Sequence, residues 1–319
     1  MGYFNSYFNS IVFISSFLTI LQFISCNESK PSEGFKLEGT PLVVEGMTGH
    51  TQSSLLIFGD CISKKIHIYS LEGRLIRTID TEKFGVLSLF GSKVNSSGQI
   101  LWVVGNCKVS ADNKPCLLEI DLNNGELKEL YLSNEFAHTF NDITLTKDEQ
   151  VFITDHVSGG LYTLNKSKDS VEKFLFGDQL KNANGICSDG VDLFVSTSNG
   201  FLKVNPSTKK VMKLSFTDFR IAGIDGLYYY ENSLIGIQNV FYPLAISRFF
   251  LNQERTKIDS AKILHIDPNS KEIPTTGAII AHKLWFMKNT NITALNFENG
   301  RVIDSIKLKP IEVHRINLR

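Results

Sequence analysis

The feature that most constrains this fold is an internal repeat, in which a small or polar pair precedes an apolar strand, a short turn and a second strand. Repeats a few tens of residues long are typical of propellers and solenoids, because a single repeat cannot cover its own apolar faces. Six repeat starts align along the chain: VEGMTGHTQSSLLIFGD at Val44, FGVLSLFGSKVNSSGQILWVVGN at Phe84, FNDITLTKDEQVFITDH at Phe140, ANGICSDGVDLFVST at Ala183, GIDGLYYYENSLIGIQN at Gly223 and PTTGAIIAHKLWFMKN at Pro274.

A second pattern follows the first within these units, in which two alternating runs flank a turn rich in Asn, Gly or Pro. It begins at Leu117, Leu161, Leu202 and Ile292. Such turns between period-2 runs indicate β-hairpins. The sequence therefore predicts an all-β fold over residues 36–319, a six-bladed β-propeller with four-stranded antiparallel blades. We expect the ring to close by pairing the segment before Glu45 with the C-terminal segment 300–318.

The N-terminal residues differ from the rest of the chain. Residues 11–24 form an apolar run that is shorter than the roughly 20 residues of a membrane-spanning helix. We interpret residues 1–25 as an export signal, with Cys26 as a lipid-carrying residue and residues 26–35 as a polar tether. The predicted location is the membrane surface of an exported lipoprotein. A periplasmic or secreted protein, or an uncleaved anchor, are the alternatives.

The remaining cysteines fit an exported protein. Cys107 and Cys116 flank the polar segment KVSADNKP, so we expect them to form a disulfide in an oxidising compartment. Cys61 and Cys187 lie inside strand-like runs, where a buried apolar side chain is the expected role. No CxxC pair or His/Cys cluster indicates zinc.

The repeat predicts where polar side chains converge. In a propeller the residue before each innermost strand lies near the axis at one end, so Glu45, Asn141, Asp142, Asn184 and Asp225 should meet there. Oxygen ligands without thiolate or imidazole favour a hard cation, Ca²⁺ first, with another divalent cation as an alternative. The competing interpretation is that the Asn-Gly and Asp-Gly pairs only form turns.

These motifs resemble a known family. VEG, FND, ANG and IDG at the repeat starts are similar to the senescence marker protein/gluconolactonase group, which is related to the paraoxonases and the strictosidine synthase-like propellers. FNDITLTKDEQVFITDH followed by ANGI resembles the paraoxonase motif pair that supplies two asparagine ligands to calcium. The resemblance implies that Glu45, Asn141, Asn184 and Asp225 bind the metal. It also implies that Asp225 is the catalytic general base.

The sequence departs from that family at two positions. The histidine that paraoxonases place at the second blade's entry is missing, since FGVLSLFG stands there, and Thr139 replaces a basic residue of sugar lactonases. Asp142, His138 and His156 are candidate substrate contacts, and His50 is a weaker one. The alternative for each histidine is a solvated or hydrogen-bonded loop side chain.

Two functions of different classes follow from these observations. The first is a calcium-dependent hydrolase of a lactone or related ester, and the second is a noncatalytic, metal-stabilised surface propeller that binds a glycan, peptide or protein. Lys and Arg total 33, as do Asp and Glu, and they are interspersed, so no basic stripe indicates nucleic acid. We expect a monomer that meets a membrane only through its N-terminal lipid.

Overall fold

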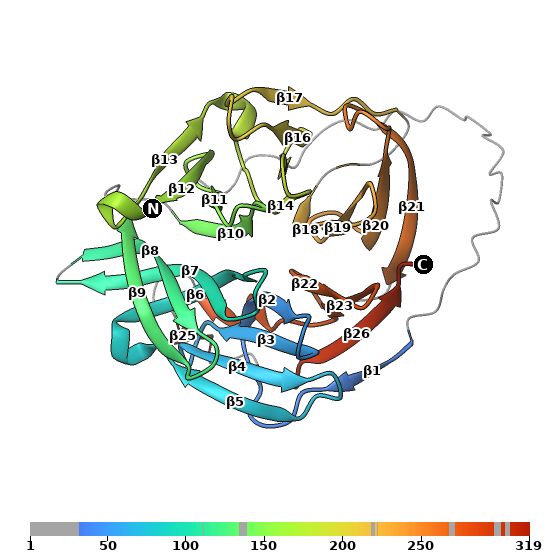
Figure 1. Cartoon of the computed structure of the whole chain (residues 1–319). Coiled ribbons are helices and arrows are strands. Elements are labelled where there is room, and N and C mark those ends of the chain that lie inside the picture. The colour runs from blue at the N-terminus through green and yellow to red at the C-terminus, as the bar shows by residue number, and fades with distance from the viewer. Residues whose placement is uncertain are drawn as a thin grey trace, which may run out of the picture.

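The computed structural model describes residues 32–110, 112–133, 139–217, 221, 223–267, 272–296, 301–303 and 307–319. Within these ranges the chain is built from β-strands and four short 3₁₀ helices, η1 (Glu82–Phe84), η2 (Lys166–Lys168), η3 (Asp178–Leu180) and η4 (Ile292–Ala294). The strands form six four-stranded antiparallel units around one axis (Figure 1). The predicted six-bladed β-propeller is confirmed. No helix in the described ranges is long and apolar enough to cross a membrane.

Five units follow one another along the chain, each with its first strand nearest the axis. The first contains β2 (Val44–His50), β3 (Leu55–Asp60), β4 (Lys65–Ser70) and β5 (Leu75–Asp80); the second, β6 (Val86–Val94), β7 (Ile100–Val109), β8 (Asp112–Asp121) and β9 (Glu126–Ser133); the third, β10 (Phe140–Leu145), β11 (Val151–Asp155), β12 (Gly160–Asn165) and β13 (Ser170–Phe176); the fourth, β14 (Ile186–Ser188), β15 (Leu193–Thr197), β16 (Gly200–Val204) and β17 (Val211–Lys213); and the fifth, β18 (Ile224–Tyr229), β19 (Ser233–Gln238), β20 (Leu244–Leu251) and β21 (Ile258–Asp267). Outer strands β9 and β13 also pair in parallel and join two units into one sheet.

The sixth unit combines both ends of the described chain. Its strands, from the axis outward, are β22 (Gly277–Ile280), β23 (Lys283–Met287), β26 (Glu312–Asn317) and β1 (Ser32–Lys36). Phe35 of β1 pairs with Val313 of β26. The predicted closure is therefore confirmed, and it removes the exposed sheet edges that an open ring would leave.

One predicted hairpin takes a different place. The pattern beginning at Ile292 does not supply the sixth unit's outer strands. Instead, β24 (Leu295–Asn296) and β25 (Arg301–Val302) form a separate two-stranded sheet. The physical reason is that β26 and β1 already occupy both outer places beside β23.

The hairpin turns of the first and third units are closed by aspartate side chains. The Asp60 carboxylate accepts a hydrogen bond from the Ile62 amide at 3.1 Å, and the Asp155 carboxylate accepts one from Val157 at 2.9 Å. Such bonds replace ladder partners where the chain reverses. These two aspartates therefore serve the turns, and they lie opposite Val44 and Phe140, one residue before the candidate ligands Glu45 and Asn141.

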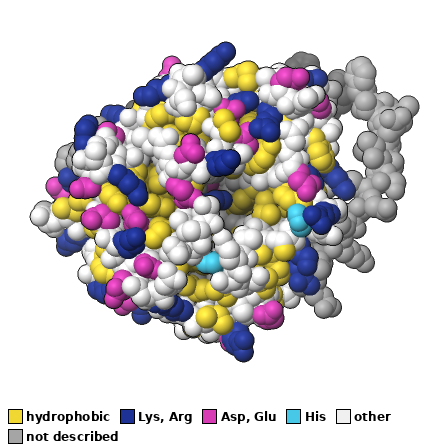
Figure 2. All heavy atoms as spheres, in the orientation of Figure 1, with side chains coloured by type: hydrophobic (Ala, Val, Ile, Leu, Met, Phe, Trp, Pro, Cys, Tyr) yellow, Lys and Arg dark blue, Asp and Glu magenta, His cyan; other side chains and the backbone are white. Residues whose placement is uncertain are grey.

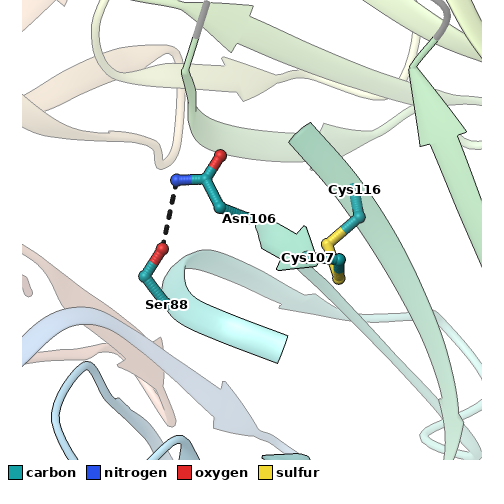
Figure 3. The surroundings of a disulfide bond; sticks show 4 residues. All are labelled: Ser88, Asn106, Cys107 and Cys116. Carbon is teal, nitrogen blue, oxygen red and sulfur yellow. Dashed lines mark hydrogen bonds between the residues drawn. A yellow bond between two sulfur atoms is a disulfide. The ribbon is translucent and has the colours of Figure 1, made fainter. Parts of the chain in front are cut away.

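The Cys107–Cys116 disulfide is present, with Cα atoms 6.0 Å apart (Figure 3). Both cysteines are fully buried, and neighbouring Asn106 donates a 3.1 Å hydrogen bond to the Ser88 hydroxyl. The segment between them is not the predicted loop. Paired β7 and β8 continue through it, since Cys107 lies opposite Lys114 and Gly105 opposite Cys116.

The apolar core lies mainly between neighbouring units. Phe58 and Tyr69 of the first unit pack in one cluster with Trp285 and Met287 of the sixth. Burying one such large side chain contributes about 1.5–3 kcal/mol. Cys61 and Cys187 are free and buried, as predicted. Each unit therefore depends on its neighbours for a covered face.

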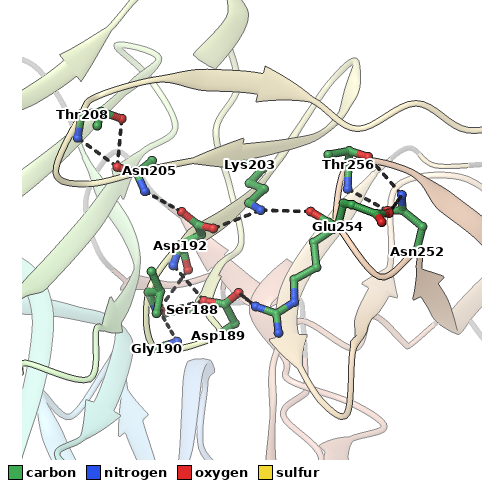
Figure 4. A network of polar contacts seen from close by, with 12 residues as sticks. Ser188, Asp189, Gly190, Asp192, Lys203, Asn205, Thr208, Asn252, Glu254 and Thr256 are labelled. Atoms are coloured by element: carbon green, nitrogen blue, oxygen red, sulfur yellow. Dashed lines mark hydrogen bonds and ion pairs between the residues drawn. The ribbon is translucent and has the colours of Figure 1, made fainter.

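Polar contacts join the fourth and fifth units at their periphery (Figure 4). The Arg255 guanidinium pairs with the fully buried Asp189 carboxylate. Lys203 pairs with Asp192 at 3.0 Å and also donates a 3.4 Å hydrogen bond to the Glu254 carbonyl. Because these groups come from both units, they link the two sheets.

Candidate metal centre

Close contacts between the backbones of neighbouring inner strands show which of their residues lie at the same height along the propeller axis. A methyl group on any of four glycines would meet a neighbouring unit's backbone oxygen at 1.8–2.9 Å, with Gly46 facing Phe90, Gly91 facing Asn141, Gly185 facing Asp225 and Gly226 facing Thr275. Thr275 closes the circle, because its hydroxyl donates a 3.1 Å hydrogen bond to the Glu45 carbonyl. We call these level residues the axial ring: Glu45, Phe90, Asn141, Asn184, Asp225 and Thr275.

Close packing of the inner strands explains the glycine in the polar residue–glycine pairs at the repeat starts. Gly46, Gly185 and Gly226 are absent from the positive-φ residues, so they are not required by turn conformation. They are required because the inner strands approach too closely for a side chain. This space requirement does not explain the residue before each glycine, and four of the six ring residues carry a carboxylate or a carboxamide.

The second unit's register differs from the predicted one. The repeat pattern predicts that this unit starts at Phe84, but Phe84 is the last residue of the 3₁₀ helix η1. Phe90 and Gly91 take the ring position instead, because β6 is nine residues long and its pairing with β7 contains two irregularities. The ring residue here is an apolar Phe90, so the second unit supplies no side-chain ligand.

Three predicted ligands are joined by hydrogen bonds. The Asn141 carboxamide donates to the Asn184 side-chain oxygen, and the Asn184 side chain in turn bonds to the Asp225 carboxylate. Asn239, which the sequence analysis did not single out, donates a 2.6 Å bond to Asp225 Oδ2. Burial raises the pKa of Asp225 to about 7 and the negative charge of Asp142 adds to this, while the bonds from Asn239 and Asn184 oppose it. Asn239 directly follows β19, and a polar residue at the end of this apolar strand is the sequence feature that could have identified it as a site residue.

Glu45 supplies the second carboxylate of the axial ring. Its Oε2 is buried and, among the residues that the structure describes, accepts no hydrogen bond. The pKa of Glu45 is raised well above its usual range, first by burial and then by the negative charges of Asp225 and Asp142. An unpartnered buried carboxylate oxygen costs about 1–3 kcal/mol or more, so it points to a positively charged partner.

The donors suit a hard divalent cation. In the described ranges no group of three or more His, Cys, Asp or Glu side chains forms a metal site. The axial ring instead offers two carboxylates and two carboxamides, from Glu45, Asp225, Asn141 and Asn184. All four provide oxygen, the ligand atom that Ca²⁺ takes in sets of six to eight. The orphaned oxygen of Glu45 fits that assignment.

Asp142 lies beside the ring but faces elsewhere. Its two carboxylate oxygens accept hydrogen bonds from the backbone amides of Ile143 at 2.8 Å and Ile186 at 3.0 Å. Burial raises the pKa of Asp142 to about 6, while these bonds and Lys93 lower it. Asp142 thus ties the third unit to the fourth, and it lines the central cavity together with Lys93.

The candidate histidines do not gather with the ligands in the described part of the chain. His156 is exposed in the turn between β11 and β12. His50 ends β2, at the opposite end of that strand from Glu45, and its ring bonds to the Gly98 carbonyl at 2.7 Å. His138 lies outside the described residues. The hydrogen-bonded loop interpretation is therefore correct for His50.

Exposed apolar side chains follow Asn239 directly. Val240, Phe241 and Tyr242 are 61%, 51% and 61% exposed. Val240 and Phe241 also lie within 3.3 Å of the position that a side chain on Gly223 would take, two residues before Asp225. An apolar surface therefore adjoins the carboxylate. Over the face in Figure 2, by contrast, acidic and basic side chains are interspersed without a single-sign patch.

Comparisons with known proteins bear on the fold. No family model and no curated protein matches the sequence. Among solved structures, the PQQ-bound aldose sugar dehydrogenase from Streptomyces coelicolor has a TM-score of 0.61 at 13% identity, covering 90% of this chain and 99% of that one. A gluconolactonase from Xanthomonas campestris has a TM-score of 0.55 at 10% identity, with 90% and 98% coverage.

A luciferin-regenerating enzyme is also similar, with a TM-score of 0.56 at 14% identity and coverage of 89% of this chain and 95% of that one. At these identities the similarity describes the arrangement of the strands. It agrees with the motifs at the repeat starts and with the six units around the axis. The chain therefore has the β-propeller fold of these structures.

Proposed function

We propose that this protein is a calcium-dependent hydrolase of a lactone or a related ester. The observation that carries the proposal is the pair of buried carboxylates, Glu45 and Asp225, with the orphaned Glu45 oxygen and two neighbouring carboxamides. Two like charges buried this closely favour a divalent cation between them. A gluconolactonase among the proteins of the same fold supports the substrate class.

The residues of the axial ring and its neighbours would have different roles in the reaction. Glu45, Asn141, Asn184 and Asp225 would hold the cation through oxygen atoms. Bound there, a divalent cation polarises a carbonyl oxygen and lowers the pKa of water. Thr275 and Thr276 hold the Glu45 backbone in place, because both hydroxyls donate to its carbonyl at 3.1 and 3.0 Å.

Asp225 is the proposed general base. Its carboxylate is oriented by Asn239, whose amide also donates a 3.0 Å bond to the Pro274 carbonyl and so spans two units. Burial raises the pKa of Asp225 to about 7 in the metal-free protein, and a bound cation would lower it, so the carboxylate would be ionised at physiological pH, as a base requires. The adjoining apolar residues Val240 and Phe241 would contact the carbon skeleton of the substrate.

The noncatalytic alternative draws on a specific observation. The ring position that carries a histidine in paraoxonases holds Phe90 here, and His156 is exposed in a hairpin turn. In a noncatalytic propeller the cation would only hold the units together. Such a protein would still need the carboxylates as ligands, but it would need no general base. Calcium binding alone therefore does not distinguish the two functions.

A lactone panel on the purified protein tests the proposal. Glucono-δ-lactone, γ-butyrolactone and an acyl homoserine lactone would be followed by acid release, with EDTA and then with calcium restored. We expect turnover that EDTA abolishes and calcium recovers. Asp225→Asn should remove it even at saturating calcium, because an amide cannot accept the proton, whereas the exposed Asp178→Asn should match the parent protein.

Two other results would separate the alternatives. Calcium binding without turnover of any ester in the panel would support the noncatalytic propeller. Full turnover by Asp225→Asn would leave the metal centre in place but exclude Asp225 as the base. Equal turnover with and without EDTA would refute the metal-dependent hydrolase itself.

We also propose that the protein is exported and anchored through Cys26, a residue outside the described ranges. The apolar run that ends near this cysteine and the polar tether after it motivate the proposal. The buried Cys107–Cys116 disulfide is consistent with an oxidising compartment. Mass spectrometry of membrane-extracted protein should find lipidated Cys26 as the N-terminus; an intact Met1 would contradict it.

A further inference from the structure

A central cavity, separate from the axial ring, runs between the inner strands. Its volume is about 220 Å³, and all six units contribute to its wall, with Thr48, Lys93, Thr144, Cys187, Tyr228 and Thr276 as one residue from each. At about 30 Å³ per water molecule, this is room for roughly seven waters or one small organic molecule. Of the predicted site residues only Asp142 lines it.

The cavity contains one unmatched positive charge. Lys93 is half-buried, and no carboxylate in the described part of the chain lies within ion-pair distance of its amino group. Burial raises the pKa of Asp142 and of Cys187, and the charge of Lys93 opposes both shifts from across the cavity, where these residues lie on the third and fourth units. The ammonium therefore acts across the channel. Both Asp142 oxygens already accept backbone bonds, so that carboxylate is held by its own amide partners.

One hydroxyl group in the same wall has unused hydrogen-bonding capacity. The Tyr228 oxygen accepts a hydrogen bond from the Gly277 amide, so its own proton is available to a ligand. The hydroxyl oxygen of Ser92 is enclosed by protein, so a ligand in the cavity does not reach it.

We propose that this cavity binds a small hydroxylated organic acid, with the ligand carboxylate on Lys93 and one of its hydroxyls on Tyr228. An inorganic anion would use the charge but leave most of the volume and the Tyr228 hydroxyl unused. A neutral polyol would use that hydroxyl but not the charge. The site does not depend on the proposed hydrolase, since the ring ligands Glu45, Asn141, Asn184 and Asp225 do not line the cavity.

Calorimetric titration with three probes tests this assignment on EDTA-treated protein, in which the axial ring holds no calcium for gluconate to coordinate. Sodium gluconate should bind at one site, whereas sorbitol, which has the same carbon number without the carboxylate, should bind at least ~10-fold more weakly because it forms no charged hydrogen bond. Sodium sulfate should also be weaker. Sulfate binding as tight as gluconate would overturn the organic-acid assignment, as would tight sorbitol binding.

Variants locate the site. Lys93→Met should reduce gluconate affinity ~10–100-fold, because a charged hydrogen bond is lost, while Lys93→Arg should retain most of it. Lys108→Met, on an exposed lysine of the same unit, is the matched control and should bind normally. If Lys93→Met binds gluconate as tightly as the parent protein, the ligand lies elsewhere and the proposal is wrong.

Tyr228→Phe tests the second contact. It removes the proposed hydrogen-bond donor, so gluconate binding should weaken severalfold, and it also removes the acceptor of the Gly277 amide, so the melting temperature should fall. Gluconate binding as tight as in the parent protein would exclude this hydroxyl from the site. The Tyr228 variant also serves if Lys93→Met fails to fold, which circular dichroism would reveal.

Discussion

Asn239, directly after β19, donates a 2.6 Å hydrogen bond to the carboxylate of Asp225 on the neighbouring strand β18. Since this bond lowers the pKa of Asp225, Asn239 is a positioning residue for the proposed base. Asn239→Leu should therefore raise that pKa and move the acidic limb of the pH–rate profile to higher pH. The measurement is the lactonase pH profile of both proteins. A drop in rate with an unchanged profile would indicate a structural role only.

Glu45→Gln should have opposite effects on stability and metal binding. In calcium-free protein it removes a carboxyl buried beside Asp225 and Asp142, so the free energy of unfolding should rise at alkaline pH, where that carboxyl must ionise. Calcium affinity should fall at least ~10-fold with loss of an anionic ligand. Chemical unfolding in EDTA and calcium titration check both. Glu126→Gln, on an exposed acid in β9, is the control.

Calcium-free protein should become less stable as the pH rises. The pKa of Asp225 is raised to about 7 in the fold, whereas an aspartate in an unfolded chain has a pKa of about 3.9. The folded form therefore binds a proton more tightly, so this stabilisation is complete below about pH 4 and is lost as the pH rises through about 7.

Thermal unfolding in EDTA between pH 5 and 8 measures this effect. The melting temperature should fall by a few degrees more in the parent protein than in Asp225→Asn, which cannot ionise there. Added calcium should reverse the trend, because it binds the folded state with both carboxylates charged. Identical pH dependence of the two proteins in EDTA would contradict the prediction.

The Cys107–Cys116 disulfide should stabilise the second unit. The two cysteines are nine residues apart, and closing so short a loop restricts the unfolded chain by about 2–3 kcal/mol. Replacing both by Ala should lower the free energy of unfolding by about that amount. Reductant should then have little further effect on the variant. Cys61→Ala, at a buried free thiol, provides a control for lost packing.

Much of the fold follows from local patterns in the sequence. Period-2 runs bounded by turn residues specify strands and hairpins. If each repeat forms the same unit, the repeats become blades around one axis. The same logic placed Glu45, Asn141, Asn184 and Asp225 at equivalent positions. Hydrogen bonds now link the last three, and electrostatic interaction links Glu45 to Asp225.

Other features depend on contacts between distant segments. Phe90 occupies the ring position rather than Phe84, because irregular pairing of β6 shifts the register in a way that local sequence does not record. The choice of β26 and β1 over the Ile292 hairpin was decided by pairing between the two ends of the chain. Asn239 reached Asp225 only when β19 folded back beside β18. Sequence alone thus determined the repeating unit, since strands and turns are local, while tertiary structure decided register, closure and ligand partners, since these arise between units.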